Sequence, residues 1–250
     1  MSGSIYMATS GAEVQRLRLQ VLSNNLANIN TTGFKEDQAM FRLVDPDLQQ
    51  NVLTNPPSGA VNTLVNAVIP MTTHTDFTKG PLQQTGNPFD LAIDGDGFFS
   101  IQTDQGIRYT RNGAFSINPD GLLATADGDP VMGEGGEITI DGSEVRFDGS
   151  GAVIVDGAEV DKLRIVSISE MTALHKIGKT LFQLDETQGN EEQISYGGVQ
   201  QGFLEGSNVN AVKAMTELIE VQRGYESYQK MIQTIGEIDA RVISGVGTVE

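Results

Sequence analysis

The 250-residue sequence has no cysteine and no tryptophan, and it has only two histidines. Without cysteine the chain has neither disulfides nor thiolate chemistry, which excludes cysteine catalysis and cysteine-based metal centres. His74 and His175 lie about 100 residues apart, with no cluster of other ligand residues at metal-binding spacing. We therefore expect two histidines on the surface or in loops, not metal ligands or general bases.

Positive charge is also scarce. The chain has 16 Lys and Arg against 33 Asp and Glu, a formal net charge of -17. Such a chain repels phosphate backbones and anionic lipid, so nucleic acid and acidic membrane surfaces are poor partners. No apolar run reaches membrane-spanning length, and the N-terminus lacks the basic and apolar regions of a cleavable Sec signal. We expect no membrane-spanning segment and, if the protein is exported, a route other than Sec.

Motifs of catalysis are missing. No Gly-x-Ser-x-Gly elbow and no phosphate-cradling glycine loop before a helix is present. Asp94–Gly97 resembles the start of a calcium loop, but loop positions five and twelve hold Phe98 and Gln105 instead of an oxygen ligand and a glutamate. The segment is therefore interpreted as a hairpin turn. The sequence predicts no enzyme, no metal and no cofactor.

Both ends of the chain carry a narrow apolar stripe at heptad spacing. The N-terminal stripe consists of Ile5, Ala8, Ala12, Gln15, Leu19, Leu22, Leu26 and Ile29. The C-terminal stripe consists of Ala211, Ala214, Leu218, Val221, Tyr225, Tyr228, Ile232, Ile235, Asp239 and Val242. Alternating steps of three and four keep one helix face apolar, and a narrow seam fits another helix. We predict that the two helices pair with each other or with copies in an assembly. We expect Leu19, Leu22, Leu26 and Ile29 to pack against Leu218, Tyr225, Ile232 and Ile235 or their equivalents in a neighbour. The full predicted interface consists of Ile5, Ala8, Ala12, Leu19, Leu22, Leu26, Ile29, Leu218, Val221, Tyr225, Tyr228, Ile232 and Ile235.

The predicted helices span residues 4–30 and 207–244. Ser207 and Asn208 are suitable caps for the second helix, and Gly33 suits a left-handed position after the first. Gly224 and Gly236 interrupt the second helix at a cost of roughly 1 kcal/mol each relative to alanine. Close approach of neighbouring helices would explain them.

The region between the helices follows a different pattern. Residues 36–84 form a loop or extended connector, either flexible or ordered, with Val61–Ile69 a candidate extended stretch. Residues 85–200 contain short apolar runs separated by Gly and Asp turns, which predicts a β-rich sandwich or barrel-like domain. The candidate strands include Glu137–Ile140 and Ala152–Val155, and the candidate turns include Asp94–Gly97, Thr103–Gly106 and Asn118–Gly121. With residues 1–35 and 201–250 as terminal helical segments, the predicted fold class is α+β.

Three blocks of the sequence form a set of motifs in a fixed order. The first block contains Asn25, Leu26, Ala27, Asn28, Thr31, Gly33 and Phe34. The central block contains Asn87, Pro88, Asp90, Gly95, Gly97 and Phe98. The third contains Ser207, Asn208, Val209 and Asn210, with Glu220, Gln222, Arg223 and Tyr225 downstream. Together the blocks resemble those of the bacterial flagellar axial proteins, the rod and hook family. Phe89 and Gly224 depart from the usual Leu and Ala of the family.

This resemblance implies a structural subunit. In the family, terminal coiled-coil-like helices line the inside of a tube and the β domain lies outside. The rod carries motor torque across the periplasm to the hook. Copies of the subunit and neighbouring rod proteins are the implied partners, together with the flagellar type III export apparatus.

Within the family, Ile5–Ala12 resembles the opening of proximal-rod members of F type, and distal-rod members of G type are the alternative. Hook subunits are usually much longer. A different class, a secreted β-rich adhesin or binding module with helical oligomerisation arms, also fits the pattern of two helices around a β domain.

Overall fold

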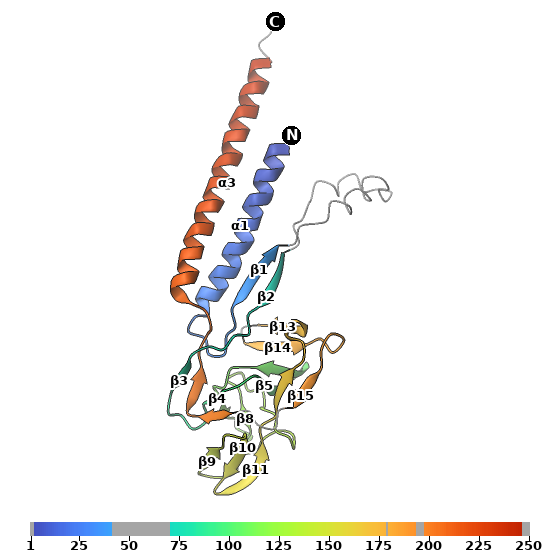
Figure 1. Cartoon of the computed structure of the whole chain (residues 1–250), viewed down its shortest axis with the longest axis vertical. Helices are drawn as coiled ribbons and strands as arrows, with labels where there is room; N and C mark the ends of the chain where they lie inside the picture. The colour runs from blue at the N-terminus through green and yellow to red at the C-terminus, as the bar shows by residue number, and fades with distance from the viewer. Residues whose placement is uncertain (1–2, 42–70, 179, 194–197, 247–250) are drawn as a thin grey trace. The chain divides into compact units, whose positions relative to one another are not determined.

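The computed structural model describes residues 3–41, 71–178, 180–193 and 198–246. The chain forms two compact units (Figure 1). The helical unit comprises Met1–Leu26, Asp37–His74 and Asn210–Glu250, and the β unit comprises Ala27–Glu36 and Thr75–Val209. Two long helices and antiparallel sheets confirm the α+β prediction. The predicted extended stretch Val61–Ile69 lies outside the described residues.

The helical unit is built on α1 (Gly3–Ala27) and α3 (Ala211–Val246), which lie side by side (Figure 1). The prediction extended the first helix too far, because Ile29 lies in a turn after α1. It also chose the wrong cap. Asn210 caps α3, since its Oδ1 accepts a hydrogen bond from the Lys213 N–H at 3.1 Å.

Part of the predicted connector is ordered. β1 (Asp37–Phe41) and β2 (Met71–Thr75) form a two-stranded sheet. Asn25, which is fully buried, fixes the end of α1 to the start of β1. Its Nδ2 donates to the Asp37 carbonyl at 2.8 Å, and its Oδ1 accepts from the Asp37 N–H at 3.0 Å. The Asn-rich helix end is therefore a packed terminus whose amide bonds to a neighbouring backbone.

A six-stranded antiparallel sheet forms the centre of the β unit, in the order β13-β14-β6-β5-β12-β15. Its strands are β5 (Phe98–Thr103), β6 (Gly106–Thr110), β12 (Ile165–Ile168), β13 (Leu174–Ile177), β14 (Leu181–Leu184) and β15 (Glu191–Gln193). A 3-10 turn, η1 (Met171–Ala173), precedes β13.

Smaller sheets complete the unit. A three-stranded sheet contains β9 (Val145–Phe147), β10 (Ala152–Val155) and β11 (Ala158–Lys162). The remaining strands pair two by two: β3 (Leu82–Gln84) with β17 (Phe203–Glu205), β4 (Leu91–Ile93) with β16 (Val199–Gln201), and β7 (Ser116–Ile117) with β8 (Leu123–Ala124).

Both faces of the central sheet are apolar. Phe98, Val166 and Phe182 belong to one buried cluster, while the neighbours Phe99 and Ile165 belong to a second, larger cluster. Successive side chains of a strand point to opposite faces, so β5 and β12 each contribute to both clusters. This explains why Phe98–Ile101 is buried throughout and lacks the alternation of a half-exposed strand.

The predicted strands mostly form. Ala152–Val155 matches β10, whereas Glu137–Ile140 makes only isolated bridges. Gly97, Gly106 and Gly121 have positive φ angles, as the predicted turns require.

Candidate functional site: a helix seam and a buried junction

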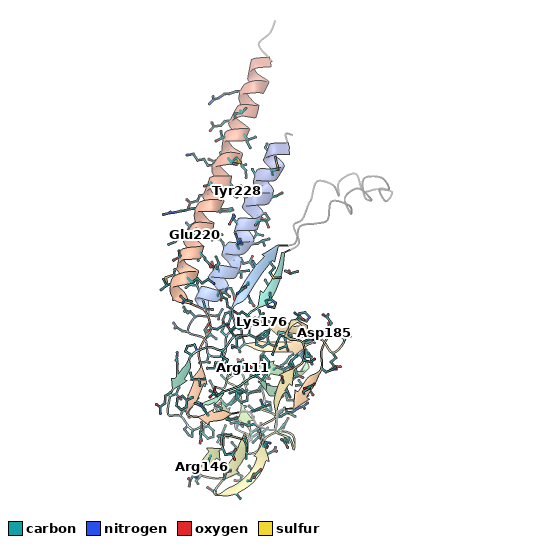
Figure 2. All side chains as sticks on the ribbon, in the orientation of Figure 1. Arg111, Arg146, Lys176, Asp185, Glu220 and Tyr228 are labelled. Carbon is teal, nitrogen blue, oxygen red and sulfur yellow. The ribbon has the colours of Figure 1, made fainter. Side chains whose placement is uncertain are left out.

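The helix seam is the contact between the two heptad stripes of α1 and α3. A Cβ added at Gly11 would lie 2.4 Å from the Tyr228 ring, so the two helices meet closely at this point. Further along α1, the Gln15 side chain lies 3.5 Å from the place that a Cβ at Gly224 would take. Gly11 meets Tyr228, and Gln15, four residues later in α1, meets Gly224, four residues earlier in α3. The helices are therefore antiparallel. Figure 2 labels Tyr228 on α3.

If this register continues along both helices, each residue of one predicted stripe lies opposite a residue of the other stripe, with an offset of at most one residue. Ile5 comes opposite Ile235, Leu19 opposite Val221 and Leu22 opposite Leu218. Burial agrees with the register. Ala8, Ala12, Ala214 and Val221 are buried, and every other stripe residue from Ile5 to Leu26 and from Ala211 to Ile235 is half-buried. The pairing of the two terminal helices is confirmed, and it is made within one chain.

Three details of the predicted seam were wrong. Ile29 lies beyond the helix. Tyr225, Ile232 and Ile235 face the first half of α1, and do not face Leu19–Leu26. The close approach occurs at Gly11, which the sequence analysis did not single out. At Gly224 a Cβ would make ordinary contact with Gln15, and at Gly236 it would meet nothing within 4 Å.

The buried junction is an ion network in the β unit, formed by Lys35, Arg111 and Glu205. The Lys35 ammonium donates to Glu205 Oε1 at 2.6 Å, and the Arg111 guanidinium lies 3.4 Å from Glu205 Oε2. All three side chains are almost completely buried. The central position of Arg111 in the unit is labelled in Figure 2. Two cations that share one carboxylate away from water lose the free energy of hydration. Further hydrogen bonds must compensate for this loss.

Backbone groups supply most of those bonds. Lys35 also donates to the Thr78 carbonyl at 2.7 Å, and Arg111 donates to the Gly95 carbonyl at 2.9 Å. Glu205 Oε1 accepts a further bond from the Gly80 N–H at 2.9 Å. The Arg111 guanidinium carbon lies 5.1 Å from the centre of the Phe98 ring. Burial lowers the pKa of Lys35 and of Arg111, and in both cases the Glu205 carboxylate opposes that shift.

The junction joins the first and third family blocks. The Gly33 N–H donates to the Glu205 carbonyl at 2.7 Å, and the Glu36 N–H donates to Asn208 Oδ1 at 2.7 Å. Asn208 Nδ2 in turn donates to the Asp76 carbonyl at 2.8 Å. Gly33 has a φ of +69°, and a Cβ there would lie 2.2 Å from the Asn112 nitrogen, so only glycine fits.

The remaining motif residues have structural roles. Asn87 Nδ2 donates to Asp90 Oδ1 at 2.9 Å, and the Asp90 carbonyl accepts from the Gly202 N–H at 2.7 Å. Phe34, Phe98 and Val209 are buried, and Lys176 Nζ lies 4.2 Å from the Phe34 ring centre. The motif blocks therefore close the β unit around its two chain ends.

Sequence reasoning missed Lys35, Arg111 and Glu205. Lys35 directly follows Phe34 of the first block and Glu205 lies two residues before Ser207 of the third block, so their opposite charges beside the two blocks were a usable signal. Nothing in the sequence indicated that Arg111, from the middle of the β region, would join them.

Chemical sites are sparse in the part of the chain that the structure describes. It holds no group of three or more His, Asp or Glu residues arranged to bind a metal. His74 and His175 are exposed on β2 and β13. None of the described helices is long and apolar enough to cross a membrane.

Comparison with known proteins agrees with this geometry. Residues 5–35 match the family model described as flagella basal body rod protein. Residues 92–155 match the D1 domain of the flagellar hook protein FlgE/F/G family, and residues 200–245 match the C-terminal model of the flagellar basal body rod FlgEFG proteins.

Curated relatives match along the whole chain. The flagellar basal-body rod protein FlgF of Caulobacter vibrioides is 34% identical, and the alignment covers 100% of both chains. FlgG of Agrobacterium fabrum is 35% identical over 96% of this chain and 98% of its own length. FlgF of Mesorhizobium japonicum is 30% identical over 99% of both. The chain belongs to the flagellar basal-body rod protein family and is a structural component of the rod, not an enzyme.

Proposed function

We propose that this chain is a proximal-rod subunit of F type, whose terminal helices build the shaft that carries motor torque to the hook. The observation that carries the proposal is the antiparallel helix seam, in which two stripes more than 180 residues apart meet in register. A long helix pair with a narrow seam is a suitable unit for a tube wall, because it packs lengthwise against similar pairs.

The junction fits a role under mechanical load. The chain crosses between the helical unit and the β unit four times, and Gly33–Glu36 and Glu205–Asn208 lie at two of these crossings, through which torque reaches the β unit. Both are held by the same buried ions and by direct hydrogen bonds to each other. Buried ion pairs hold a defined geometry, since any displacement leaves an unpaired charge.

Relatives of F and G type have similar identities to this chain, so the choice of proximal rod rests on end-to-end alignment with FlgF and on the resemblance of Ile5–Ala12. The family comparisons favour a rod subunit over an adhesin. We further propose a periplasmic location and export through the flagellar type III apparatus. The cysteine-free composition suits passage through a narrow channel before assembly, because no disulfide can hold the chain folded.

Deletion of this gene from its native bacterium, followed by electron microscopy of isolated basal bodies, tests the proposal. We expect loss of swimming and basal bodies that stop before the distal rod, both restored by the intact gene. A deletion strain with complete basal bodies and normal swimming would overturn the function. Basal bodies that stop only after a normal proximal rod would favour the G-type alternative.

Hydrogen exchange of the purified chain tests the state before assembly. If the helices order only on assembly, residues 3–27 and 211–246 should exchange fast in a dilute monomer while the β unit is protected. Slow exchange across residues 211–235 would show that the seam is already closed in the free chain and that ordering on assembly is wrong.

A further inference from the structure

The helix seam uses the apolar stripes of both helices within one chain. Because its stripes face each other within one chain, they are not free to hold neighbouring subunits. An assembly of helix pairs therefore needs a second set of contacts.

A second apolar stripe is present on the outside of α3. Val212, Met215 and Ile219 are 75%, 51% and 50% exposed. Their spacing of three and four places them on one face, roughly 140° around the helix from the seam at ~100° per residue. Lys213 and Glu217 flank this outer stripe and lie 3.9 Å apart. Large apolar side chains in a row at the surface of a helix mark an interaction site.

α1 carries a complementary face. Met7, Val14 and Val21 repeat at seven-residue intervals and lie roughly 120° from the seam. Met7 is 73% exposed, and Val14 and Val21 are half-buried. Val212 to Ile219 spans about 10 Å along its helix, the same distance as one Met7–Val14 repeat.

The net charge of the helix pair indicates which kind of partner fits the outer stripe. Residues 3–27 and 211–246 together contain six Lys and Arg and six Asp and Glu, so the helix pair has no net charge although the chain carries -17. A basic or acidic partner would gain nothing from this neutral surface. A neutral apolar helix face of the same period, which another copy presents, fits it without Coulomb cost.

We infer that Val212, Met215 and Ile219 form the contact between neighbouring copies of this chain, docking on the Met7–Val14–Val21 face of the next copy. This inference rests on the proposed function and adds the residues that join subunits. The seam holds each helix pair together, and the outer stripe joins one pair to the next.

Site-specific cross-linking tests the contact, and because the chain has no native cysteine, an introduced cysteine is the single thiol of this subunit. Ile219→Cys and the control Ser227→Cys are each labelled with a benzophenone maleimide in basal bodies isolated from the deletion strain expressing that variant. Ser227 is exposed on α3, roughly 90° from the outer stripe. We expect Ile219→Cys to cross-link to residues 3–27 of a second copy at least tenfold more than Ser227→Cys.

A second readout separates this inference from the proposed function. Ile219→Asp should abolish swimming in the deletion strain, and Ser227→Asp should restore it. Both purified variants should retain wild-type helical circular dichroism, because neither position faces the seam. If the deletion strain swims without any copy, the function itself fails. If the intact gene and Ile219→Asp restore swimming equally, or if the cross-link reaches a different protein, the outer-stripe contact is wrong.

Discussion

The helical unit and the β unit differ most clearly in charge. The two helices hold six basic and six acidic residues, whereas residues 75–209 hold eight basic and 22 acidic residues, a formal charge of -14. Identical copies can therefore bring their helices together without Coulomb repulsion, while their β units repel each other. On the proposed function, the helices are therefore the part that can pack against other copies, and the acidic β units keep those copies apart.

Burial divides the two units in the same way. The β unit has two apolar clusters of its own and closes its chain ends with buried ions. The helical unit has a single seam in which most positions are only half-buried. Two helices alone bury too little surface to be firmly stable, so on the proposed function we expect the helical unit to gain stability from neighbouring subunits.

Glu205→Gln should break the β unit and have the largest effect. Lys35 and Arg111 would remain buried without a carboxylate, at a cost of about 3–5 kcal/mol. Thermal unfolding of the full chain should show the β transition lowered by about 10 °C. Glu134→Gln, which removes the partly exposed partner of Lys162 at 3.5 Å, is the control and should cost less than about 1 kcal/mol. Equal shifts for the two variants would refute the junction as a stabilising centre.

Leu22→Asp should damage only the helical unit. A carboxylate placed opposite Leu218 loses hydration in the seam, at a cost of about 2 kcal/mol for a half-buried site. Helical circular dichroism and restoration of swimming should both be lost, while the β transition stays unchanged. Gln20→Asp places the same charge at an exposed position of α1 and should be tolerated. A lowered β transition in Leu22→Asp would show that the two units are not separable.

Gly11→Ala sharpens the comparison by testing the register of the seam. The added methyl group meets the Tyr228 ring, and overpacking of this kind costs about 1–3 kcal/mol, partly offset by the helix preference of alanine. We expect faster hydrogen exchange in α1 and α3. In a Tyr228→Leu background the same change should be neutral or stabilising. A penalty that persists without the ring would place the helices in another register.

Salt should have the smallest effect and act through the β unit alone. Raising NaCl from about 20 to 150 mM shortens the Debye length from roughly 20 to 8 Å and screens repulsion between β units. Sedimentation at high protein concentration should show self-association strengthened a few-fold. Association of a synthetic pair of the two helices should not change. Weaker association of the full chain at higher salt would contradict the charge comparison.

The fold could be predicted from the sequence where a periodic signal was long. The two stripes predicted the helix pairing because a long heptad pattern runs along both ends, and Ala152–Val155 predicted a strand because glycines bound it on both sides. Helix ends were predicted less well. Ile29 continues the heptad pattern, but Asn25 and the turn at residues 28–30 redirect the chain toward β1.

The junction could not be predicted because its residues come from three distant parts of the sequence. Charged residues at positions 35, 111 and 205 resemble ordinary surface charges until the topology brings them together. The cap of α3 was misplaced for a related reason. Ser207 and Asn208 have capping side chains, but the Asn208 side chain bonds Glu36 and Asp76, so Asn210 takes the role.

The pairing of β3 with β17 has an evolutionary consequence. It brings the start and the end of the segment Thr75–Val209, which makes up most of the β unit, next to each other. A domain with adjacent ends behaves as a cassette, since another domain with similarly close ends can replace it without stretching the flanking chain. Lineages could thus enlarge, shrink or exchange this cassette while the helices stayed constant. For the same reason, a reporter domain spliced between residues 84 and 203 is a practical way to label a rotating shaft.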